Sequence, residues 1–382
     1  MKRVVIHSNT LWSISNFRFD LIETLTGLGY KVYCLAPKDN ISTVSESRLQ
    51  SLNTEIVNVK IDRKGTNPVK DLGYLLNLIK ILRQIKPDTA LFYTPKPNIF
   101  GSIACRTLKI PYINTINGLG SGFNKGFLIS AIIKKLYTLA LRKSSGVLVQ
   151  NHDDLDTFLK FHIVPPEISS FIPGSGINTD IYINEKVRKP VPGALKFLFS
   201  GRLIKEKGVH DFVHISRLLK TKYPESEFWI VGFIDEGNPS SITAKELEDL
   251  THSGIVIYKG KTDRIIEFLA DSDVMVFPTT YREGLPRILL EASSCSMPII
   301  TYDVPGCREV VIEGFNGFLC EKGNKEQLQE ACEKTLNMSP SELIKLGENG
   351  RKRAVSEFSI EIVNKYYISL LESVLGTDKI SQ

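Results

Sequence analysis

The stretch KFLFSGRLIKEKGVHDFVHISRLLKTK, residues 196–222, decides the fold of this chain. Its first residues, 196–200, are mostly apolar and aromatic, as in a buried strand. A basic turn with a glycine at each end, 201–208, follows, and apolar residues then recur at helical spacing over 209–222. A strand that leads through a short turn into a helix is the repeating unit of parallel α/β sheets. The stretch therefore predicts an α/β protein.

The same alternation runs through the rest of the chain. Short apolar runs predict strands at 3–7, 31–36, 55–61, 89–93, 112–116, 146–150 and 170–173, separated by helical patterns over 17–28, 69–84, 99–108 and 127–141. After a polar, proline-bearing segment, further strands are expected at 196–200, 227–231, 254–258, 273–277, 298–301 and 317–319, with helices at 209–222, 263–270, 286–295, 325–336, 339–353 and 359–375.

These patterns predict two doubly wound, Rossmann-like domains with a ligand cleft between them. We expect an N-terminal domain over 1–181, a linker over 182–194, a C-terminal domain over 195–358 and a final helix within 359–376. The final helix carries an apolar face that it must bury.

The composition is that of an ordinary globular protein. Of the 382 residues, 42% are apolar, 24% charged and 9% aromatic, which excludes a disordered, collagen-like or disulfide-scaffold chain. No apolar run is long enough for a transmembrane helix, and the N-terminal MKRVVIHSN predicts a strand, not a signal peptide. We expect reduced thiols, no zinc site and a cytoplasmic location, because the six cysteines form no CxxC pair and show no metal-ligand spacing.

Positive charge is concentrated in the N-terminal part of the chain. Residues 1–170 carry 22 lysines and arginines against 12 acidic residues, whereas the remainder carries 26 against 30. No acidic residue occurs between Asp88 and Asp153, a stretch that holds eight basic ones. The patch predicts an anionic partner, such as lipid headgroups, a diphosphate or nucleic acid, unless it is only a solvated basic surface.

The segment FLISAIIKKLYTLALRK, residues 127–143, lies within this basic stretch. Its apolar residues recur at helical spacing, and its four cations stand apart from them. Two interpretations stay open: a helix that lies in a membrane interface, and a core helix with one solvated side.

Glycines and cations follow consecutive strands of the C-terminal half. Gly201, Arg202 and Lys207 come after the first strand, Gly232 follows the second, and KGKTD at 259–263 follows the third. Because ligands of parallel sheets bind at the carboxyl ends of the strands, these residues are expected at one rim. Glycine lets a backbone approach a ligand closely, and two cations match the charge of a diphosphate. The rim therefore predicts a nucleotide site.

Two glutamates follow the fourth strand, in YREGLPRILLEA at 281–292. If Pro286 opens the helix, Glu283 lies on the loop before it and Glu291 about a turn and a half inside, where both can face one ligand. A carboxylate that accepts bonds from sugar hydroxyls gains roughly 1.5–3 kcal/mol for each. Considered alone, the pair is more typical of a surface loop and a helix-face salt bridge.

Three segments carry a resemblance to a known family: GRLIKEKGV at 201–209, IPGSGIN at 172–178 and YREGLP to NGFL at 281–319. They resemble the retaining glycosyltransferases of family 4, which have the GT-B fold of two Rossmann-like domains. TPKPNIFG at 94–101 and NGLGSGF at 117–123 resemble bacterial members that add a hexose or N-acetylhexosamine to a sugar on undecaprenyl diphosphate, for O-antigen, capsule or N-glycan assembly. In such enzymes the final helix crosses back to the N-terminal domain.

The resemblance implies a role for each matching residue on the donor side. Arg202 and Lys207 would hold the donor diphosphate, Glu291 the ribose, and Glu283 the transferred sugar. The backbone of Gly284, Leu285, Pro286 and Arg287 would hold the sugar and the β-phosphate, and Lys261 and Thr262 would border the base.

On the acceptor side, the resemblance points to the loop after the first strand, 11–18, with Asn16 and Arg18. Lys96, Asn98 and Gly118 would also meet the lipid-linked substrate. Two positions depart from the family pattern: the first loop lacks a Gly-Gly element, and Asn117 stands where many members have a histidine. Asn117 is expected to contact the donor sugar or the acceptor, or to be only a turn residue.

The resemblance also implies a mechanism. The residues expected to carry catalysis are Glu283, Arg202, Lys207 and Asn117. Charge that develops on the departing diphosphate would be stabilised by Arg202 and Lys207, without a metal ion, since no Asp-x-Asp motif follows a strand. No carboxylate is identifiable as a nucleophile, which favours front-face attack by the acceptor hydroxyl, and domain closure would bring the two half-sites together.

Four other functions share part of this pattern. A GDP-mannose-dependent mannosyltransferase would share the fold and the site. A UDP-sugar epimerase would need acid–base groups near the anomeric carbon and no lipid acceptor. A nucleic-acid binder is disfavoured because aromatic residues do not interleave the basic stretch, and a nicotinamide enzyme because no GxGxxG follows the first strand. The expected enzyme transfers a hexose or N-acetylhexosamine from a UDP-sugar, with retention, and needs no cofactor. It is expected to be cytoplasmic and peripheral at the inner face of the plasma membrane, with a nucleotide sugar, a lipid-linked glycan acceptor and an anionic lipid surface as partners.

Overall fold

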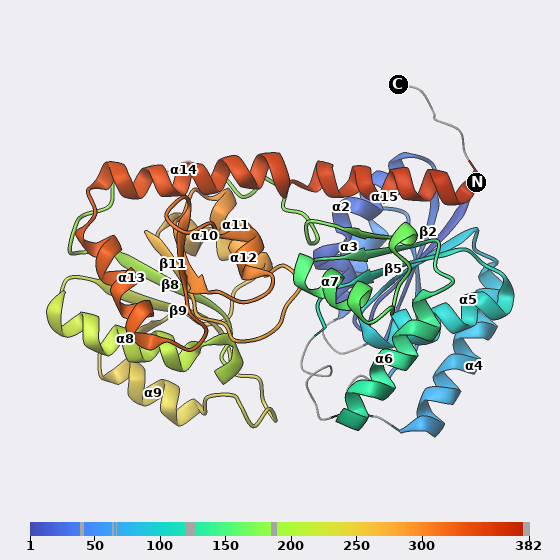
Figure 1. Cartoon of the computed structure of the whole chain (residues 1–382), viewed down its shortest axis with the longest axis horizontal. Coiled ribbons are helices and arrows are strands. Elements are labelled where there is room, and N and C mark those ends of the chain that lie inside the picture. The colour runs from blue at the N-terminus through green and yellow to red at the C-terminus, as the bar shows by residue number, and fades with distance from the viewer. Residues whose placement is uncertain (39–41, 63–64, 66, 120–126, 185–188, 377–382) are drawn as a thin grey trace. The chain divides into compact units, whose positions relative to one another are not determined.

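The computed structural model describes residues 1–38, 42–62, 65, 67–119, 127–184 and 189–376 (Figure 1). It divides into two compact units, Met1–Ser175 with Ile360–Gln382, and Gly176–Ser359. The segment 182–194, predicted as a linker, falls within the second unit, where the N–H of Gly193 donates to the carbonyl oxygen of Leu336. None of the described helices is both long and apolar enough to cross a bilayer.

The first unit is built on a seven-stranded parallel sheet. Its strands are β1 (Arg3–His7), β2 (Lys31–Ala36), β3 (Glu55–Asn58), β4 (Thr89–Tyr93), β5 (Tyr112–Ile116), β6 (Gly146–Val149) and β7 (Ser169–Phe171). They lie in the order β3-β2-β1-β4-β5-β6-β7. The strand order changes direction between β1 and β4, so ligands are expected beyond the carboxyl ends of these two strands.

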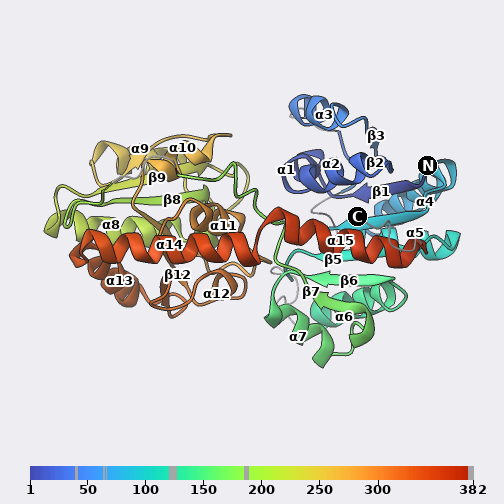
Figure 2. The ribbon, with the colours of Figure 1, turned by 90° about the horizontal axis from the view of Figure 1, so that it is seen from above.

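Helices connect and cover these strands. They are α1 (Leu11–Phe17), α2 (Phe19–Gly27), α3 (Ser42–Gln50), α4 (Pro68–Ile85), the π-helical turn η1 (Pro97–Gly101), α5 (Ser102–Leu108), α6 (Phe127–Leu141), α7 (His152–Lys160), the 3-10 turn η3 (Pro166–Ile168) and α15 (Ile360–Leu375). The last helix, α15, lies beside α2 in both views (Figures 1 and 2).

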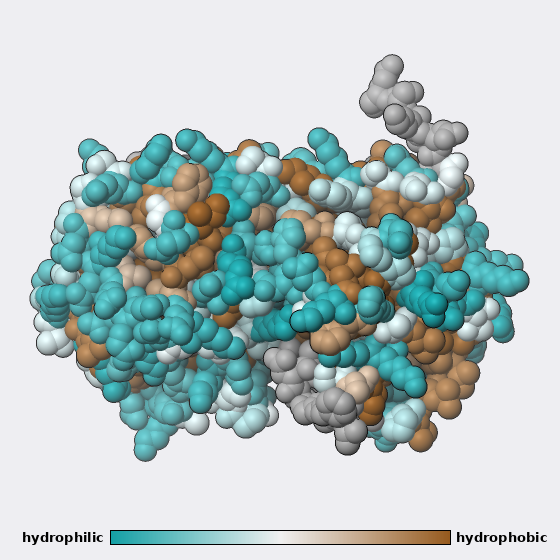
Figure 3. Space-filling model, viewed as in Figure 1, coloured by the Kyte–Doolittle hydropathy of each residue, from teal (hydrophilic) through white to brown (hydrophobic). Residues whose placement is uncertain are grey.

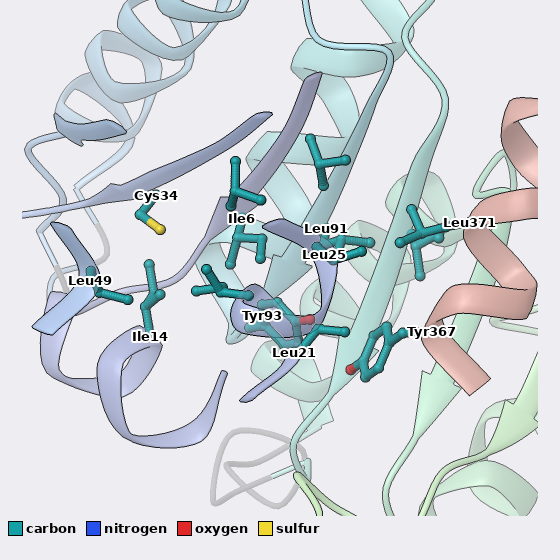
Figure 4. Packing of buried hydrophobic residues seen from close by; sticks show 14 of the residues in the cluster. Ile6, Ile14, Leu21, Leu25, Cys34, Leu49, Leu91, Tyr93, Tyr367 and Leu371 are labelled. Carbon is teal, nitrogen blue, oxygen red and sulfur yellow. The ribbon is translucent and has the colours of Figure 1, made fainter. Parts of the chain in front are cut away.

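Helix α15 completes one side of the core of the first unit. Tyr367 and Leu371 are fully buried among side chains of the sheet and of α2, as Figure 4 shows around Tyr93 and Leu21. The hydroxyl of Tyr367 lies 2.8 Å from Oγ1 of Thr115 on β5. The apolar face read from the sequence of this helix is therefore buried against the N-terminal sheet.

The second unit repeats the plan with six parallel strands. The strands are β8 (Lys196–Arg202), β9 (Glu227–Phe233), β10 (Ile257–Tyr258), β11 (Val274–Phe277), β12 (Ile299–Tyr302) and β13 (Gly317–Cys320), in the order β10-β9-β8-β11-β12-β13. The helical elements are η4 (Lys205–Lys207), α8 (Val209–Lys222), α9 (Ala244–His252), α10 (Ile265–Ala270), α11 (Arg287–Ser294), α12 (Cys307–Val310), α13 (Lys325–Asn337) and α14 (Pro340–Glu357).

The segment 11–18 was predicted as a loop, and this prediction was wrong, because residues 11–17 form helix α1. Thr10 caps the helix by accepting the N–H of Ser13 at 3.0 Å, while Leu11 and Ile14 bury one side of it. The short helices α3, α9 and α12 were not predicted either. Helix α9 is held by a capping box between Thr243 and Glu246, a local signal that the sequence does contain.

The buried imidazole of His7 makes the stability of the first unit depend on pH. Its Nε2 lies 2.6 Å from the Tyr74 hydroxyl and its Nδ1 2.7 Å from the carbonyl oxygen of Leu35. Burial lowers the pKa of His7 from 6.5 to about 4, although the bond to Leu35 opposes the shift. The unfolded chain therefore takes up a proton at higher pH than the folded chain does.

It follows that His7 contributes stability above about pH 6.5, and that this contribution is lost as the pH falls toward 4. Between these values we expect the wild type to lose about 3 kcal/mol of unfolding free energy that the His7→Asn variant does not lose. Urea unfolding of both proteins across this pH range measures the difference. Parallel pH profiles for the two proteins would show that His7 has no such role.

Candidate active site

The turn that follows β8 carries Lys207, one of the two cations predicted to hold a diphosphate. Strand β8 continues through Gly201 to Arg202, two residues beyond the predicted end, before the turn η4. Gly208 closes the turn at a φ of 87°. A Cβ at Gly208 would overlap the carbonyl oxygen of Pro278, so only glycine lets the turn pack against the end of β11.

The carbonyl oxygen of Glu206 fastens this turn to the loop after β11. It accepts the backbone N–H groups of Thr280 at 2.8 Å and Tyr281 at 3.1 Å. It also accepts the hydroxyl of Thr279 at 3.0 Å. The two segments that carry Lys207 and Glu283 are therefore joined through one backbone atom, close to both side chains.

Lys207 and Glu283 meet directly. The Lys207 ammonium donates to Oε1 of Glu283 at 2.5 Å, and the two side chains are 13% and 19% exposed. The rings of Phe277 and Tyr281 lie 5.4 and 5.7 Å from the ammonium. This partly dehydrated pair stands at the carboxyl end of β11, where a ligand of a parallel sheet is expected.

The backbone of Gly284, Leu285 and Pro286 leads from Glu283 into α11. These three residues are buried, and Pro286 is the N-cap of the helix. Gly306, before α12, packs so closely that a Cβ there would overlap the carbonyl oxygen of Gly284. The first backbone N–H groups of a helix lack the carbonyl partners that later ones have, so the start of α11, in the segment after β11, favours an anion.

Glu291 lies inside α11, buried and paired with Arg287 of the same helix. Arg287 Nε donates to Oε1 of Glu291 at 2.9 Å, and the Glu291 side chain is 9% exposed. Burial raises the pKa of Glu291, whereas Arg287 and a hydrogen bond with Tyr182 oppose the shift. Burial and the same carboxylate raise the pKa of Tyr182 to about 12.

Arg202 and the end of β9 complete the described rim. Arg202 Nη1 donates to Oδ2 of Asp235 at 3.0 Å, and its side chain is 40% exposed. Gly232 and Gly201 lie side by side on β9 and β8, where a Cβ at Gly232 would overlap the Gly201 carbonyl oxygen.

The residues predicted near the base lie beyond β10. The Lys261 ammonium stands 5.5 Å from the ring of Phe233 at the end of β9. The hydroxyl of Thr262 accepts the N–H of Arg264 at 2.9 Å, so its contact in this structure is within its own turn.

In the first unit, Arg18 packs on the sheet, whereas Asn16 bonds within its own helix. The guanidinium of Arg18 lies 4.0 Å above the ring of Tyr93, and Arg18 is only 4% exposed. The amide of Asn16 donates to the carbonyl oxygen of Trp12 at 2.9 Å. The Trp12 side chain, one helical turn before Asn16, is 47% exposed.

Lys96 and Asn98 follow β4. The Lys96 ammonium donates to Asp71 Oδ1 of α4 at 2.5 Å, and both side chains are 18% exposed. Asn98 is 1% exposed; its amide donates to the carbonyl oxygen of Thr115 and accepts from Asn114, each at 2.9 Å. The structure thus shows Asn98 bonded within the packing between β4 and β5, and its role as an acceptor contact stays a prediction.

Asn117 and Gly118 follow β5. The Oδ1 atom of Asn117 is buried and has no hydrogen-bond partner within the described part of the chain. The next backbone N–H, that of Leu119, donates to the buried carboxylate of Asp154 at 3.0 Å. The rest of the NGLGSGF motif, 120–123, lies outside the described residues.

Comparison with known proteins identifies the chain. Residues 183–353 match the family described as "Glycosyl transferases group 1", and residues 11–151 match "Glycosyl transferase 4-like". The two matches cover separate parts of the chain, and they show that it is a glycosyltransferase. The resemblance predicted from the sequence motifs is confirmed.

Similar proteins match this glycosyltransferase over most of its length. One, from Campylobacter jejuni, is N,N'-diacetylbacillosaminyl-diphospho-undecaprenol alpha-1,3-N-acetylgalactosaminyltransferase, 27% identical over 95% of this chain and 96% of its own. Another, from Escherichia coli, is UDP-Gal:alpha-D-GlcNAc-diphosphoundecaprenol alpha-1,3-galactosyltransferase, 25% identical over 74% and 76%.

Solved structures share the fold. Anabaena Alr3699/HepE in complex with UDP superposes with a TM-score of 0.79 over 98% of this chain and 100% of that one, at 18% identity. A glycosyltransferase from Rickettsia africae superposes with the same TM-score, at 16% identity over 99% of each chain. The predicted GT-B fold of two Rossmann-like domains is therefore confirmed.

Several residues of the glycosyltransferase were not anticipated as parts of the site. Asp235 pairs with Arg202, Tyr182 bonds Glu291, and Asp154 holds the loop after β5. Tyr182 was read as the start of a linker. The composition of 235–241, DEGNPSS, is typical of an ordered turn, which is the one signal that could have drawn attention to Asp235.

Proposed function

We propose that this glycosyltransferase transfers a hexose or N-acetylhexosamine from a UDP-sugar, with retention, to a sugar on a polyprenyl diphosphate. The proposal is carried by the meeting of Lys207 and Glu283 at the carboxyl end of β11, beside the start of α11. It is supported by two relatives whose names give diphospho-undecaprenol-linked sugars as acceptors and, in one, a UDP-sugar as donor. The lipid-linked product would be used to assemble a bacterial surface polysaccharide.

The second unit would bind the donor. Arg202 and Lys207 would pair with the diphosphate, and the first turn of α11 would donate backbone N–H groups to the β-phosphate. Glu283 would accept hydroxyl groups of the transferred sugar, and Glu291 those of the ribose. Lys207 would exchange Glu283 for phosphate oxygens, whereas Arg202 would keep Asp235 and offer its other N–H groups to the diphosphate, so neither cation is left without a partner.

The chemistry would rest on these cations. As the sugar–phosphate bond breaks, negative charge grows on the β-phosphate oxygens, where Lys207, Arg202 and the helix start stabilise it in place. The acceptor hydroxyl would attack from the side of the leaving group, and its proton would pass to the departing phosphate. We propose that no metal ion takes part, since the two cations already match the charge of the diphosphate.

The first unit would bind the acceptor and an anionic lipid surface at the inner face of the membrane. On α4, Val69, Leu72 and Leu76 are 77%, 56% and 59% exposed, at helical spacing. On α6, Ile132 and Leu139 are 61% and 48% exposed. Figure 3 shows apolar side chains gathered over these helices. Apolar residues among lysines suit an interface with anionic headgroups, where each nearby cation contributes about 1 kcal/mol.

A transfer assay tests the proposal. The protein is incubated with UDP-glucose, UDP-galactose, their N-acetylhexosamine counterparts or GDP-mannose, and with a short polyprenyl diphosphate bearing one N-acetylhexosamine. Mass spectrometry of the lipid fraction should show one added hexose or N-acetylhexosamine from a UDP-sugar, in the presence of EDTA. If only GDP-mannose supplies the added sugar, the donor is GDP-mannose and not a UDP-sugar. If a free epimer is released and no lipid product forms, the protein is an epimerase and not a transferase.

A further inference from the structure

The seven-residue segment DEGNPSS, residues 235–241, follows β9 and folds into a compact loop. The N–H of Asp235 donates to the hydroxyl of Ser241, and the N–H of Asn238 donates to the carbonyl oxygen of Asp235, each at 3.0 Å. The side-chain amide of Asn238 donates to Oδ2 of Asp235, also at 3.0 Å. The carboxylate of Asp235 is therefore held in place from its own loop.

The same loop contacts the end of β8 and the turn after it through several hydrogen bonds. Arg202 Nη1 donates to Oδ2 of Asp235 at 3.0 Å. The N–H of Lys205 donates to the carbonyl oxygen of Ser240, and the Ser240 hydroxyl donates to Oε1 of Glu206, both at 2.8 Å. Through Glu206, whose carbonyl oxygen binds 279–281, the loop is linked to the segment that carries Glu283.

We propose that Asp235 is a positioning residue for the donor: it orients the guanidinium of Arg202 toward the diphosphate. This inference rests on the proposed function. An arginine side chain has many rotamers, and its planar group recognises phosphate only in a defined orientation. Asp235 binds the guanidinium of Arg202 at Nη1, and the Arg202 side chain is 40% exposed. Other N–H groups of the guanidinium therefore stay available to a phosphate.

The alternative is that Asp235 only opposes the donor as a nearby negative charge. The two roles predict opposite signs. If Asp235 positions Arg202, removing Asp235 leaves the Arg202 side chain mobile until the donor binds. The donor must then immobilise this side chain, which weakens its affinity. An opposing charge that is removed strengthens affinity.

The test measures UDP binding by titration calorimetry and the donor KM and kcat in the transfer assay. Asp235→Ala should weaken UDP binding by about 3- to 10-fold, the factor for immobilising one long side chain, and should raise KM more than it lowers kcat. Asp235→Asn keeps an acceptor for Arg202 and Asn238 and should stay within about 2-fold of the wild type. Asp249→Ala, which removes an exposed carboxylate from α9, is the matched control and should change nothing.

A double-substitution cycle shows whether Asp235 acts through Arg202. In an Arg202→Ala background, Asp235→Ala should have no further effect on UDP binding. A loss that persists in this background, equal losses in Asp235→Ala and Asp235→Asn, or tighter binding in either variant would overturn the inference. Failure of the wild type to bind UDP or GDP is a distinct result, because it contradicts the proposed function itself and removes the inference with it.

Discussion

Replacing Lys207 by alanine is expected to lower the turnover of sugar transfer by about 10²–10³-fold, the usual loss when one preorganised donor to a developing anion is removed. The expectation follows from the position of the ammonium, 13% exposed and bound to Glu283 at the carboxyl end of β11. In this dehydrated place a positive charge acts more strongly on a phosphate than it would in water. The measurement is kcat with saturating donor and acceptor.

Lys205→Ala is the matched control for this substitution. Lys205 lies in the same turn, is exposed, and contributes its backbone N–H to Ser240, which alanine retains. Its turnover should equal that of the wild type, and the circular dichroism spectra of both variants should match it. Turnover of Lys207→Ala within about threefold of the wild type would remove Lys207 from the reaction and leave the proposed donor site without its main cation.

Replacing Glu291 by alanine is expected to lower the unfolding free energy of the second unit by about 1.5–3 kcal/mol, because it removes the charged partner of Arg287, whose side chain is only 24% exposed. The Glu291 side chain is only 9% exposed and accepts from Arg287, with Tyr182 as a further partner. Urea unfolding of the whole chain, followed by circular dichroism, measures the loss.

Two further variants show whether the loss of stability comes from breaking the Arg287–Glu291 ion pair. Glu348→Ala removes a glutamate of α14 whose side chain is 54% exposed and whose Oε2 lies 3.9 Å from Nζ of Lys345. This variant should lose little unfolding free energy. The double variant Arg287→Ala with Glu291→Ala removes both charges, so it should be less destabilised than the sum of the single variants. An additive double variant would mean that the pair contributes no coupling energy.

Both sheets could be predicted because parallel strands buried on both sides appear as short apolar runs, as at 89–93 and 274–277. Gly201, Gly208, Gly232 and the cations Arg202 and Lys207 could be placed near one rim because all lie at or just after the carboxyl ends of predicted strands. Helix α1 could not be recognised, since its seven residues are too few for a periodic pattern and its cap, Thr10, is a common loop residue.

The partners of the site residues could not be predicted from spacing. Arg202 and Asp235 are far apart in sequence, and they meet because β8 and β9 are neighbours in the sheet. Lys96 and Asp71 are also far apart, and they meet because the segment after β4 lies beside helix α4. Asn98 shows the opposite difficulty. A polar residue after a strand suggests a ligand contact, but here its amide satisfies buried backbone and side-chain groups between β4 and β5.

The central claim is that the rim formed by β8, β9, β11 and α11 binds the nucleotide of a UDP-sugar. Thermal unfolding with UDP, GDP, ADP or NAD, each with and without EDTA, tests it most directly. A nucleotide at 100 times its Kd adds about 2.7 kcal/mol to the stability of the state that binds it. The account predicts that UDP raises the unfolding temperature equally with and without EDTA; no rise with any of the four nucleotides would contradict it.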